Sequence, residues 1–231
     1  MMRTVRSASW AAAAAMGLVL GPTVIPASAY AADVCADIGG AVDRGGLCQV
    51  HESTPNYTLD MSFPVDFPNQ AAVNDFITQT RNGFLNETRS PNFANVPYVL
   101  DMKATRWASH TTTSVSFETY EDLGGAHPTT WFRTFNYDMV RNRPITFSDL
   151  FAPGTDPLKA ILPVVTKKLE SEMGTAPPIL DGAGTDPANY QNFAVTPSDV
   201  VFFFDRGALM PGAAGTYTVY VPRNVIPPLN V

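Results

Sequence analysis

The sequence contains few of the residues from which enzymes most often build reactive centres. Its 231 residues include two cysteines and three histidines, and the histidines at positions 51, 110 and 127 are scattered. A zinc hydrolase needs clustered ligands, and a serine hydrolase of the nucleophile-elbow type needs a G-x-S-x-G string, which the sequence lacks. The sequence therefore predicts no catalytic residue, no metal site and no cofactor.

Positive charge is also scarce and is not clustered. Lysine and arginine total 15 against 21 aspartates and glutamates, which gives a formal net charge of -6. Nucleic-acid-binding proteins neutralise phosphates with clustered basic side chains, and basic clusters hold anionic lipid in the same way. We therefore expect neither nucleic acid nor a lipid surface as a partner, and we interpret the acidic charge as an aid to solubility.

The only long apolar run lies at the N-terminus. Arg3 and Arg6 precede apolar residues 8–20 and then small residues, the pattern of a secretory signal peptide. The run is shorter than the roughly 20 apolar residues of a membrane span, although a retained anchor is the alternative. We predict a signal peptide over residues 1–32, an exported mature chain and no stable membrane insertion. The candidate cleavage points follow Ala29, Ala31 or Ala32.

Both cysteines, Cys35 and Cys48, lie just after this segment. In an exported protein, two cysteines so close together favour a disulfide. Closing a loop of this size contributes roughly 3 kcal/mol in the chain-entropy picture. We expect the bond to fasten an otherwise floppy N-terminal segment, because a redox role would favour the closer Cys-x-x-Cys spacing.

Apolar and polar residues alternate on both sides of a glycine turn near the middle of the chain. The alternation covers residues 114–119 and 130–137, and Gly124, Gly125 and Pro128 lie between them. Alternation is typical of strands, and glycine accepts the positive φ of a tight turn. We predict two adjacent paired strands. The second is an interior strand, since both of its faces are partly apolar.

The other elements follow from apolar residues at period two for strands and at helical spacing for helices. An N-cap at Asn69 begins one helix, whereas Asp156 and Pro157 begin another that Gly174 ends. Residues 174–192 are rich in glycine, proline and asparagine and predict a long surface loop. We expect helices over 70–88 and 157–173, and strands over 57–63, 98–107, 193–196, 199–205 and 217–221.

Together these elements predict an α+β fold, with mainly antiparallel sheets and two amphipathic helices packed on them. We expect two closely associated lobes: an N-terminal α+β lobe over 33–125 with a disulfide-fastened start, and a C-terminal α+β domain over 126–231. We expect the protein to be a monomer.

Several tracts of the sequence resemble a known family. They are GGAHPTT, RPITFSDLF, DPANYQNFAVT followed by VVFFF, PGAAGTYTVYVPRNVI, CADIGGAVDRGGLCQV and FPNQAAVNDFITQTRNGFL. In these tracts the chain resembles the secreted mycobacterial immunogenic proteins, known as culture-filtrate antigens. The part from about Thr134 to Pro222 also resembles the domain that ends the lysozyme-sensing anti-sigma factor RsiV and some peptidoglycan deacetylases. The resemblance implies an α+β fold, export and no established enzymatic activity.

His127, in the glycine turn of the hairpin, is the most notable single residue and matches a histidine of that family. A lone histidine lacks an orienting partner, so the simpler interpretation is that its ring fixes the turn. The alternative is that His127 contacts a binding partner. Glu118 and Glu121 could be offered as the carboxyl pair of a glycosidase, but a spacing of three on a strand puts them on opposite faces.

Three hypotheses for function follow. The favoured one is a non-enzymatic, exported binding protein that engages an unknown macromolecule, a protein or a cell-wall component, through an exposed sheet face or the 174–192 loop. The second is a protein that binds lysozyme or another cell-wall hydrolase. The third is an enzyme that acts on cell-wall glycans or esters. The sequence leaves open the identity of the partner, and whether the protein acts on a host or in the producing cell wall.

Overall fold

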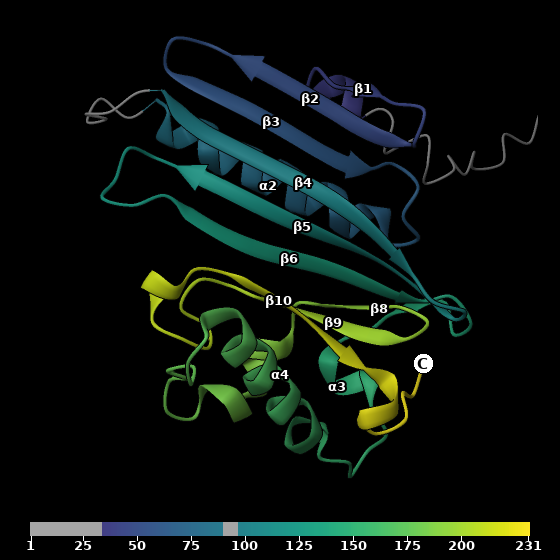
Figure 1. The fold of residues 1–231 in the computed structure, drawn as a ribbon. Coiled ribbons are helices and arrows are strands. Elements are labelled where there is room, and N and C mark those ends of the chain that lie inside the picture. The colour runs from purple at the N-terminus through teal and green to yellow at the C-terminus, as the bar shows by residue number, and fades with distance from the viewer. Residues whose placement is uncertain (1–33, 90–96) are drawn as a thin grey trace, which may run out of the picture.

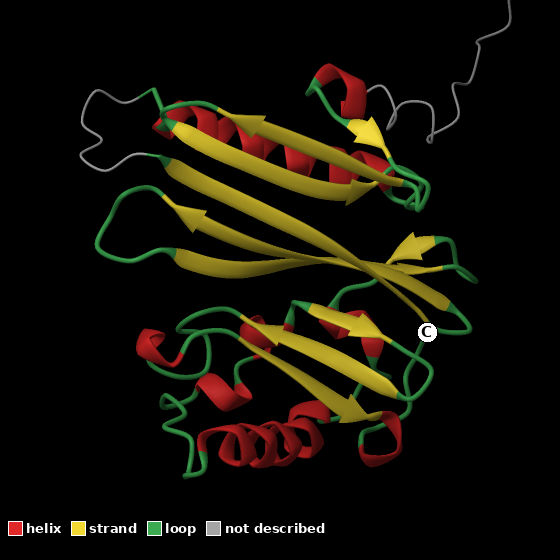
Figure 2. Cartoon of the chain, turned by 45° about the horizontal axis from the view of Figure 1, so that its top comes forward, coloured by secondary structure: helices red, strands yellow, loops and turns green. Residues whose placement is uncertain are grey.

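The computed structural model describes residues 34–89 and 97–231. The expected signal peptide and its cleavage points lie outside the described residues. Within them, the chain forms two units, each a β-sheet covered by one long helix (Figures 1 and 2). The expected α+β fold with mainly antiparallel sheets is confirmed.

The first unit is a seven-stranded sheet in which the strands follow the order of the chain. All neighbouring pairs are antiparallel except β3 and β4, which run parallel. A parallel pair needs a crossover connection, and α2 (Gln70–Glu87) provides it. The strands are β1 (Ala41–Val42), β2 (Leu47–Ser53), β3 (Tyr57–Pro64), β4 (Tyr98–Ala108), β5 (Thr112–Asp122), β6 (Thr129–Asp138) and β7 (Arg143–Pro144).

Helix α2 covers one face of this sheet, behind β3 to β5 in Figure 1. Its buried stripe includes Val73, Ile77 and Phe84, which pack in one cluster with apolar residues of the strands. Asn69 is the N-cap as expected, but its side chain caps no backbone group. The next residue, Gln70, fastens the start of the helix, because its amide donates to the carbonyl of Pro64 at 2.8 Å.

The second unit is a three-stranded sheet in the order β10-β9-β8, covered by α4 (Pro157–Met173). Helix α4 begins and ends as expected: the Asp156 side chain accepts from the Lys159 amide, and Gly174 has the left-handed φ of 70°. The other elements are β8 (Phe193–Val195), β9 (Asp199–Phe204), β10 (Tyr217–Pro222), α3 (Phe147–Leu150) and the short 3-10 helices η1 (Ala183–Thr185), η2 (Pro187–Tyr190), η3 (Gly212–Ala214) and η4 (Arg223–Val225).

Strand β9 joins the two units because both of its faces are buried. Phe202 and Phe204 pack in the cluster that includes α4. The intervening Phe203 packs against Phe132 of β6 and Trp107 of β4, with ring centroids 5.4 and 5.7 Å apart. The layers therefore follow the order α2, large sheet, small sheet, α4. Burying a large apolar side chain contributes about 1.5–3 kcal/mol, so β9 anchors the whole arrangement.

The central hairpin is confirmed, since β5 and β6 pair antiparallel over ten residue pairs. Strand β6 is interior to the sheet as expected, although its second neighbour, β7, is only two residues long. The expected division between residues 125 and 126 falls in the turn of this hairpin. Hydrogen bonding between strands therefore crosses that boundary.

Two features go beyond the expectations. Residues 47–53, which include Cys48, form β2 and pair with β3 along the whole length of β2. Residues 174–192 lie mostly at the surface as expected, but they contain η1 and η2, and Tyr190 among them is fully buried. Glycine and proline content marks where regular elements stop, but it does not show where an irregular segment packs.

The disulfide between Cys35 and Cys48 is confirmed, with its sulfur atoms 2.01 Å apart. It joins a helical turn at 34–37 to β2, and both cysteines are buried. Gly40 lies directly against it: a Cβ atom there would come within 2.5 Å of the Cys48 Sγ. The bond therefore belongs to the core of the first unit, and the close approach explains why this position carries a glycine.

Candidate functional site

A groove runs along the edge of β6 that faces away from β5. It consists of two hollows of about 620 and 270 Å³, and both are lined by Ala72, Arg133, Phe135 and Asn192. Because they share four lining residues, the hollows adjoin. We call the combined surface the β6 groove. Its walls come from α2 on one side and from the second unit on the other.

One wall of the β6 groove is aromatic. Phe76 of α2 lies at the centre, with the rings of Trp131 and Phe135 at 5.8 and 5.7 Å between centroids. All three are partly exposed. The guanidinium of Arg133 lies 5.3 Å from the ring centroid of Phe135, in the range of a cation–π contact. The groove therefore presents apolar ring surface to solvent.

The other lining side chains are polar. Asp75 and Gln79 come from α2, whereas Asn192 and Asp205 come from the second unit. Burial raises the pKa of the Asp205 carboxyl, and the hydrogen bond from the Phe132 amide at 2.6 Å opposes this only in part. The β6 groove thus combines aromatic faces with carboxyl and amide groups, the composition of a site that orients a ligand by a few polar contacts.

The backbone at the base of the groove is already satisfied. Asn192 accepts from the Thr134 amide at 3.2 Å and donates to the Phe132 carbonyl at 3.0 Å. The Asp205 carboxylate accepts a hydrogen bond from the Phe132 amide. An added strand would need these same groups, so an extended peptide cannot join the sheet here by strand addition.

A separate hollow, of about 350 Å³, contains His127. It lies between the turn of the β5–β6 hairpin and the loop from 206 to 216. Arg206 holds the two segments together, because its Nε donates to the carbonyl of Gly212 at 2.7 Å and its Nη1 to that of Pro128 at 3.1 Å. We call this the His127 hollow. Its lining is Tyr120, His127, Pro128, Thr130, Arg206, Gly212, Ala213, Gly215 and Thr216.

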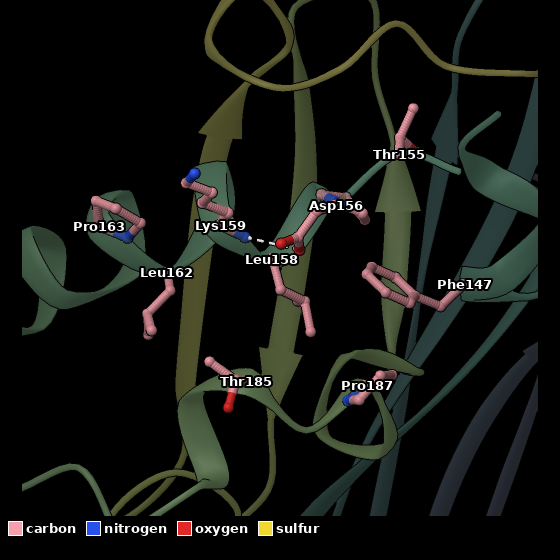
Figure 3. A pocket seen from close by; sticks show the side chains of 10 residues that line it. Phe147, Thr155, Asp156, Leu158, Lys159, Leu162, Pro163, Thr185 and Pro187 are labelled. Atoms are coloured by element: carbon pink, nitrogen blue, oxygen red, sulfur yellow. Dashed lines mark hydrogen bonds between the residues drawn. The ribbon is translucent and has the colours of Figure 1, made fainter. Parts of the chain in front are cut away.

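Another cavity, of about 690 Å³, lies at the start of α4, away from the β6 groove and the His127 hollow. Figure 3 shows Leu158 and Leu162 pointing from α4 toward Thr185 and Pro187. Asp156, the one carboxylate in its lining, accepts a hydrogen bond as the helix cap. The walls are mostly apolar, and the charged side chains in the lining are Asp156 and Lys159.

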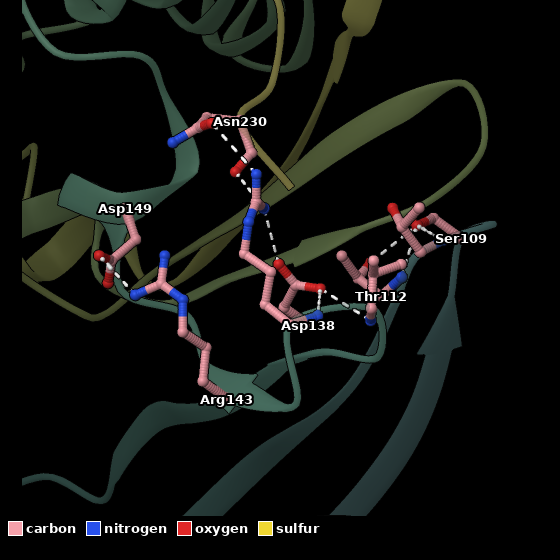
Figure 4. A network of polar contacts seen from close by, with 9 residues as sticks. Ser109, Thr112, Asp138, Arg143, Asp149 and Asn230 are labelled. Carbon is pink, nitrogen blue, oxygen red and sulfur yellow. Dashed lines mark hydrogen bonds and ion pairs between the residues drawn. The ribbon is translucent and has the colours of Figure 1, made fainter.

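A polar network ties the C-terminal tail to the end of β6 (Figure 4). The buried carboxylate of Asp138 accepts from the backbone amides of Val140 and Arg141 and from the Arg141 side chain. Arg141 also donates to the carbonyl of Asn230 at 2.8 Å. Burial raises the pKa of Asp138, but the hydrogen bonds from Arg141 and Val140 outweigh it and lower the pKa overall. Every group is used in holding the fold, so this network is structural.

The other polar residues singled out in the sequence do not meet at one site. Glu118 is exposed and Glu121 is half-buried, on opposite faces of β5 as expected. His51 contacts Asp60, with Nδ1 and Oδ1 2.6 Å apart, and their side chains are 68% and 51% exposed.

Within residues 34–89 and 97–231, no three histidine, cysteine or acidic side chains gather as metal ligands. In the same part of the chain, no helix is long and apolar enough to cross a membrane.

Sequence reasoning identified His127 but not the residues around it. Arg206 is 79 positions further along the chain and approaches the hairpin turn only through the packing of the two units. Likewise, the β6 groove joins α2, β6 and the residues after η2. No local pattern connects such distant segments, so only the fold could bring them together.

The fold defines an α+β protein of two stacked sheets with several hollows on its surface. The chain belongs to the family of mycobacterial immunogenic proteins that includes MPB64 and MPT64, as expected from its motifs. It is 38% identical over 196 residues to MPT64 of Mycobacterium tuberculosis, which covers 83% of this chain and 86% of that protein. Residues 148–224 match a family described as a protein of unknown function, DUF3298.

Other relatives carry different names. The chain is 45% identical over 201 residues to Esterase Rv3036c of M. tuberculosis, covering 85% of this chain and 88% of the esterase. It is 24% identical over 157 residues to the peptidoglycan-N-acetylmuramic acid deacetylase PdaC of Bacillus subtilis, covering 67% of this chain but only 32% of that enzyme. A solved DUF3298-family protein of Bacteroides fragilis shares the fold, with a TM-score of 0.50 and 14% identity over 80% of this chain and 91% of that one.

Proposed function

We propose that the protein is an exported, non-enzymatic binding protein that holds a cell-wall glycan in the β6 groove. The observation that carries the proposal is the pairing of partly exposed aromatic rings with carboxyl and amide side chains along one continuous groove. Export rests on the N-terminal charge and apolar pattern of the sequence.

A sugar chain matches both walls of the groove. The C–H face of a sugar ring is apolar and can lie flat on Trp131 or Phe135, which supply large rigid contact areas. The hydroxyl groups at the ring edge need donors and acceptors, and the side chains of Asp75, Gln79 and Asn192 provide them. A groove also admits a polymer of any length, whereas an enclosed pocket would not.

A protein partner fits the same groove less well. Strand addition is the commonest way to bind an extended peptide at a sheet edge, and Asn192 and Asp205 already occupy that edge. The name of PdaC points to peptidoglycan as the material on which that relative acts, and the aligned part is only a third of it. The glycan proposal therefore depends on the groove, with the relative as secondary support.

The test is binding of the mature chain to purified peptidoglycan and to soluble glycan strands released from it. We expect Trp131→Ala to weaken binding at least tenfold and Gln79→Ala to weaken it less, since the ring supplies most of the contact area. Tyr220→Ala is the matched control, because Tyr220 is a 51% exposed aromatic residue of β10 outside the groove lining. Far-ultraviolet circular dichroism checks that each variant is folded.

Two results would contradict the proposal. One is a wild-type chain that retains no glycan. The other is equal loss of binding in Trp131→Ala and Tyr220→Ala. Immobilised protein that retains lysozyme but no glycan would instead favour the hypothesis of a hydrolase-binding protein.

A second candidate function is ester hydrolysis, favoured by the His51–Asp60 contact together with the 45% identity to a relative named as an esterase. An aspartate on Nδ1 leaves the other ring nitrogen available to act as a base. The nearby Ser62 is two residues from Asp60, and its Oγ accepts a hydrogen bond from the Ala104 amide at 3.1 Å. No hydrogen bond joins this serine to the imidazole, so any activation needs a rearrangement on substrate binding.

Short-chain p-nitrophenyl esters test this candidate directly. If the wild type hydrolyses them, His51→Ala should abolish the activity, whereas His110→Ala, which also removes an exposed histidine, should not. A wild-type chain without esterase activity, or an activity that survives His51→Ala, would contradict ester hydrolysis through His51. The β6 groove variants leave this readout unchanged, so the two functions can be tested separately.

A further inference from the structure

We propose that the His127 hollow is a second binding site, for an oxyanion: a carboxylate or phosphate group carried by a ligand. The inference does not depend on the β6 groove or on its ligand. It rests on the position of Arg206, on the other side chains that line the hollow, and on the absence of a carboxylate from that lining.

Arg206 is positioned before any ligand arrives. Its Nε and Nη1 donate to the carbonyls of Gly212 and Pro128, so the guanidinium plane is fixed between the two loops. These acceptors are neutral, and no ion pair to Arg206 exists within the described part of the chain. The charge is therefore uncompensated, and the Nη2 nitrogen remains available. A fixed guanidinium is well suited to carboxylate and phosphate oxygens.

The remaining polar side chains of the hollow can all donate hydrogen bonds. Tyr120 and Thr130 are directly opposite each other on β5 and β6, so their side chains share one face of the sheet. Thr216 adds a hydroxyl from the other side, and His127 adds an imidazole. A hollow of about 350 Å³ lies at the small end of the range for ligand sites. It would hold a charged group rather than a large molecule.

Among the described residues, no acidic side chain lines the hollow, although Glu118 and Asp122 lie on the same face of β5 as Tyr120. Asp205 precedes Arg206, but its carboxylate accepts from the Phe132 amide and lines the β6 groove. Glu121 follows Tyr120, so its side chain lies on the opposite face of β5. The chain as a whole carries a net charge of -6, which repels anions over long distances. Binding here therefore has to come from local contacts.

The experiment titrates the mature chain with inorganic phosphate in one arm and with acetate in the other, while chloride keeps the ionic strength constant. Backbone amide signals of residues 206–216 are followed by nuclear magnetic resonance. We expect saturable shifts confined to this loop and to the turn around His127. The arm that saturates at the lower concentration identifies the preferred oxyanion.

Arg206→Gln should weaken the binding at least tenfold. Arg223→Gln is the matched control: it removes the same charge, and Arg223 also donates to two backbone carbonyls, those of Thr196 and Pro197, at the opposite end of the β9–β10 pair. Because Arg206→Gln also removes the hydrogen bonds that hold the two loops together, Thr216→Val and His127→Gln test the hollow with Arg206 intact. Each should weaken binding at least threefold.

Three outcomes overturn the inference. They are shifts that do not saturate in either arm, equal weakening by Arg206→Gln and Arg223→Gln, and unchanged binding in both Thr216→Val and His127→Gln. Loss of glycan binding in the Trp131→Ala variant with oxyanion binding intact would show that the two sites are independent.

Discussion

The side chain of Asn192 takes the place of a neighbouring strand beside Phe132. Its Nδ2 donates to the Phe132 carbonyl at 3.0 Å, while its Oδ1 accepts from the Thr134 amide at 3.2 Å. One planar amide thus supplies the donor and the acceptor that an adjacent backbone would supply. This closes part of an edge that could otherwise pair with another chain.

Replacing Asn192 with alanine should destabilise the protein by about 1–3 kcal/mol, because two backbone groups of β6 lose their partners next to the core. Urea denaturation of the mature chain measures this change. Gln191→Ala is the control, since the exposed Gln191 only donates to the nearby Pro187 carbonyl and should cost less than about 0.5 kcal/mol. Equal stability of the Asn192→Ala variant and the wild type would contradict the role assigned to this amide.

The elements that the sequence predicted well are those with local signals. The hairpin is encoded by alternation on both sides of a glycine turn, and α4 is encoded by its cap at Asp156 and its glycine stop. Both signals act within a few residues. Strand β2 was missed because its apolar residues are few, and its place in the sheet depends on pairing with β3 and on the disulfide.

The candidate sites were less predictable because they depend on contacts between distant segments. Arg206 reaches the Pro128 carbonyl across 78 positions, and Asn192 reaches Phe132 across 60. Neither contact leaves a periodic pattern in the sequence. His127 stood out because it lies in the glycine turn of the hairpin and matches a histidine of the family. Its surroundings depend on how the small sheet packs on the large one.

Asp138→Asn should weaken the attachment of the C-terminal tail. The carboxylate accepts three hydrogen bonds from Val140 and Arg141. In asparagine an NH2 group replaces one of the two oxygens, and it would face an N–H group from which it cannot accept a hydrogen bond. We expect a loss of about 1.5–3 kcal/mol at pH 7, typical for hydrogen bonds to a charged group. Urea denaturation measures the change, and Asp37→Asn, at an exposed aspartate of the 34–37 turn, is the control.

The same substitution has a pH signature. The pKa of Asp138 is lowered in the folded state, so its contribution is present above the unfolded value of about 3.9 and is lost as the pH falls through the folded pKa. The difference between wild type and Asp138→Asn should therefore shrink below about pH 4. A difference that stays constant down to pH 2 would show that the charge is not responsible.

Asp205→Asn should have the opposite effect. Burial raises the pKa of this carboxyl, so its contribution to stability is present at low pH and is lost as the pH rises through the folded pKa. An asparagine oxygen can still accept from the Phe132 amide, and it carries no charge to desolvate. We expect the variant to match the wild type near pH 4 and to be the more stable of the two at pH 7. Melting temperatures at both pH values measure this, and a variant less stable at pH 7 would contradict it.

Tyr190 should control how the second unit responds to alkaline pH. Its hydroxyl donates to the Gly184 carbonyl at 2.8 Å, and its ring lies 5.4 and 5.3 Å from those of Phe202 and Phe204. Tyr190→Phe keeps the ring contacts but leaves the carbonyl without this donor, so we expect a loss of about 1–2 kcal/mol at pH 8.

Burial raises the pKa of Tyr190 to about 12, whereas an unfolded tyrosine ionises near 10. Stability from this residue is therefore complete below about pH 10 and is lost as the pH rises toward 12. At pH 11 the wild type should have lost about 1 kcal/mol that the phenylalanine variant retains, so the gap between them narrows. Urea denaturation at pH 8 and pH 11 measures it, with Tyr220→Phe as the exposed control. A gap that is equal at both pH values would mean that the Tyr190 hydroxyl ionises as readily in the folded protein as in the unfolded chain.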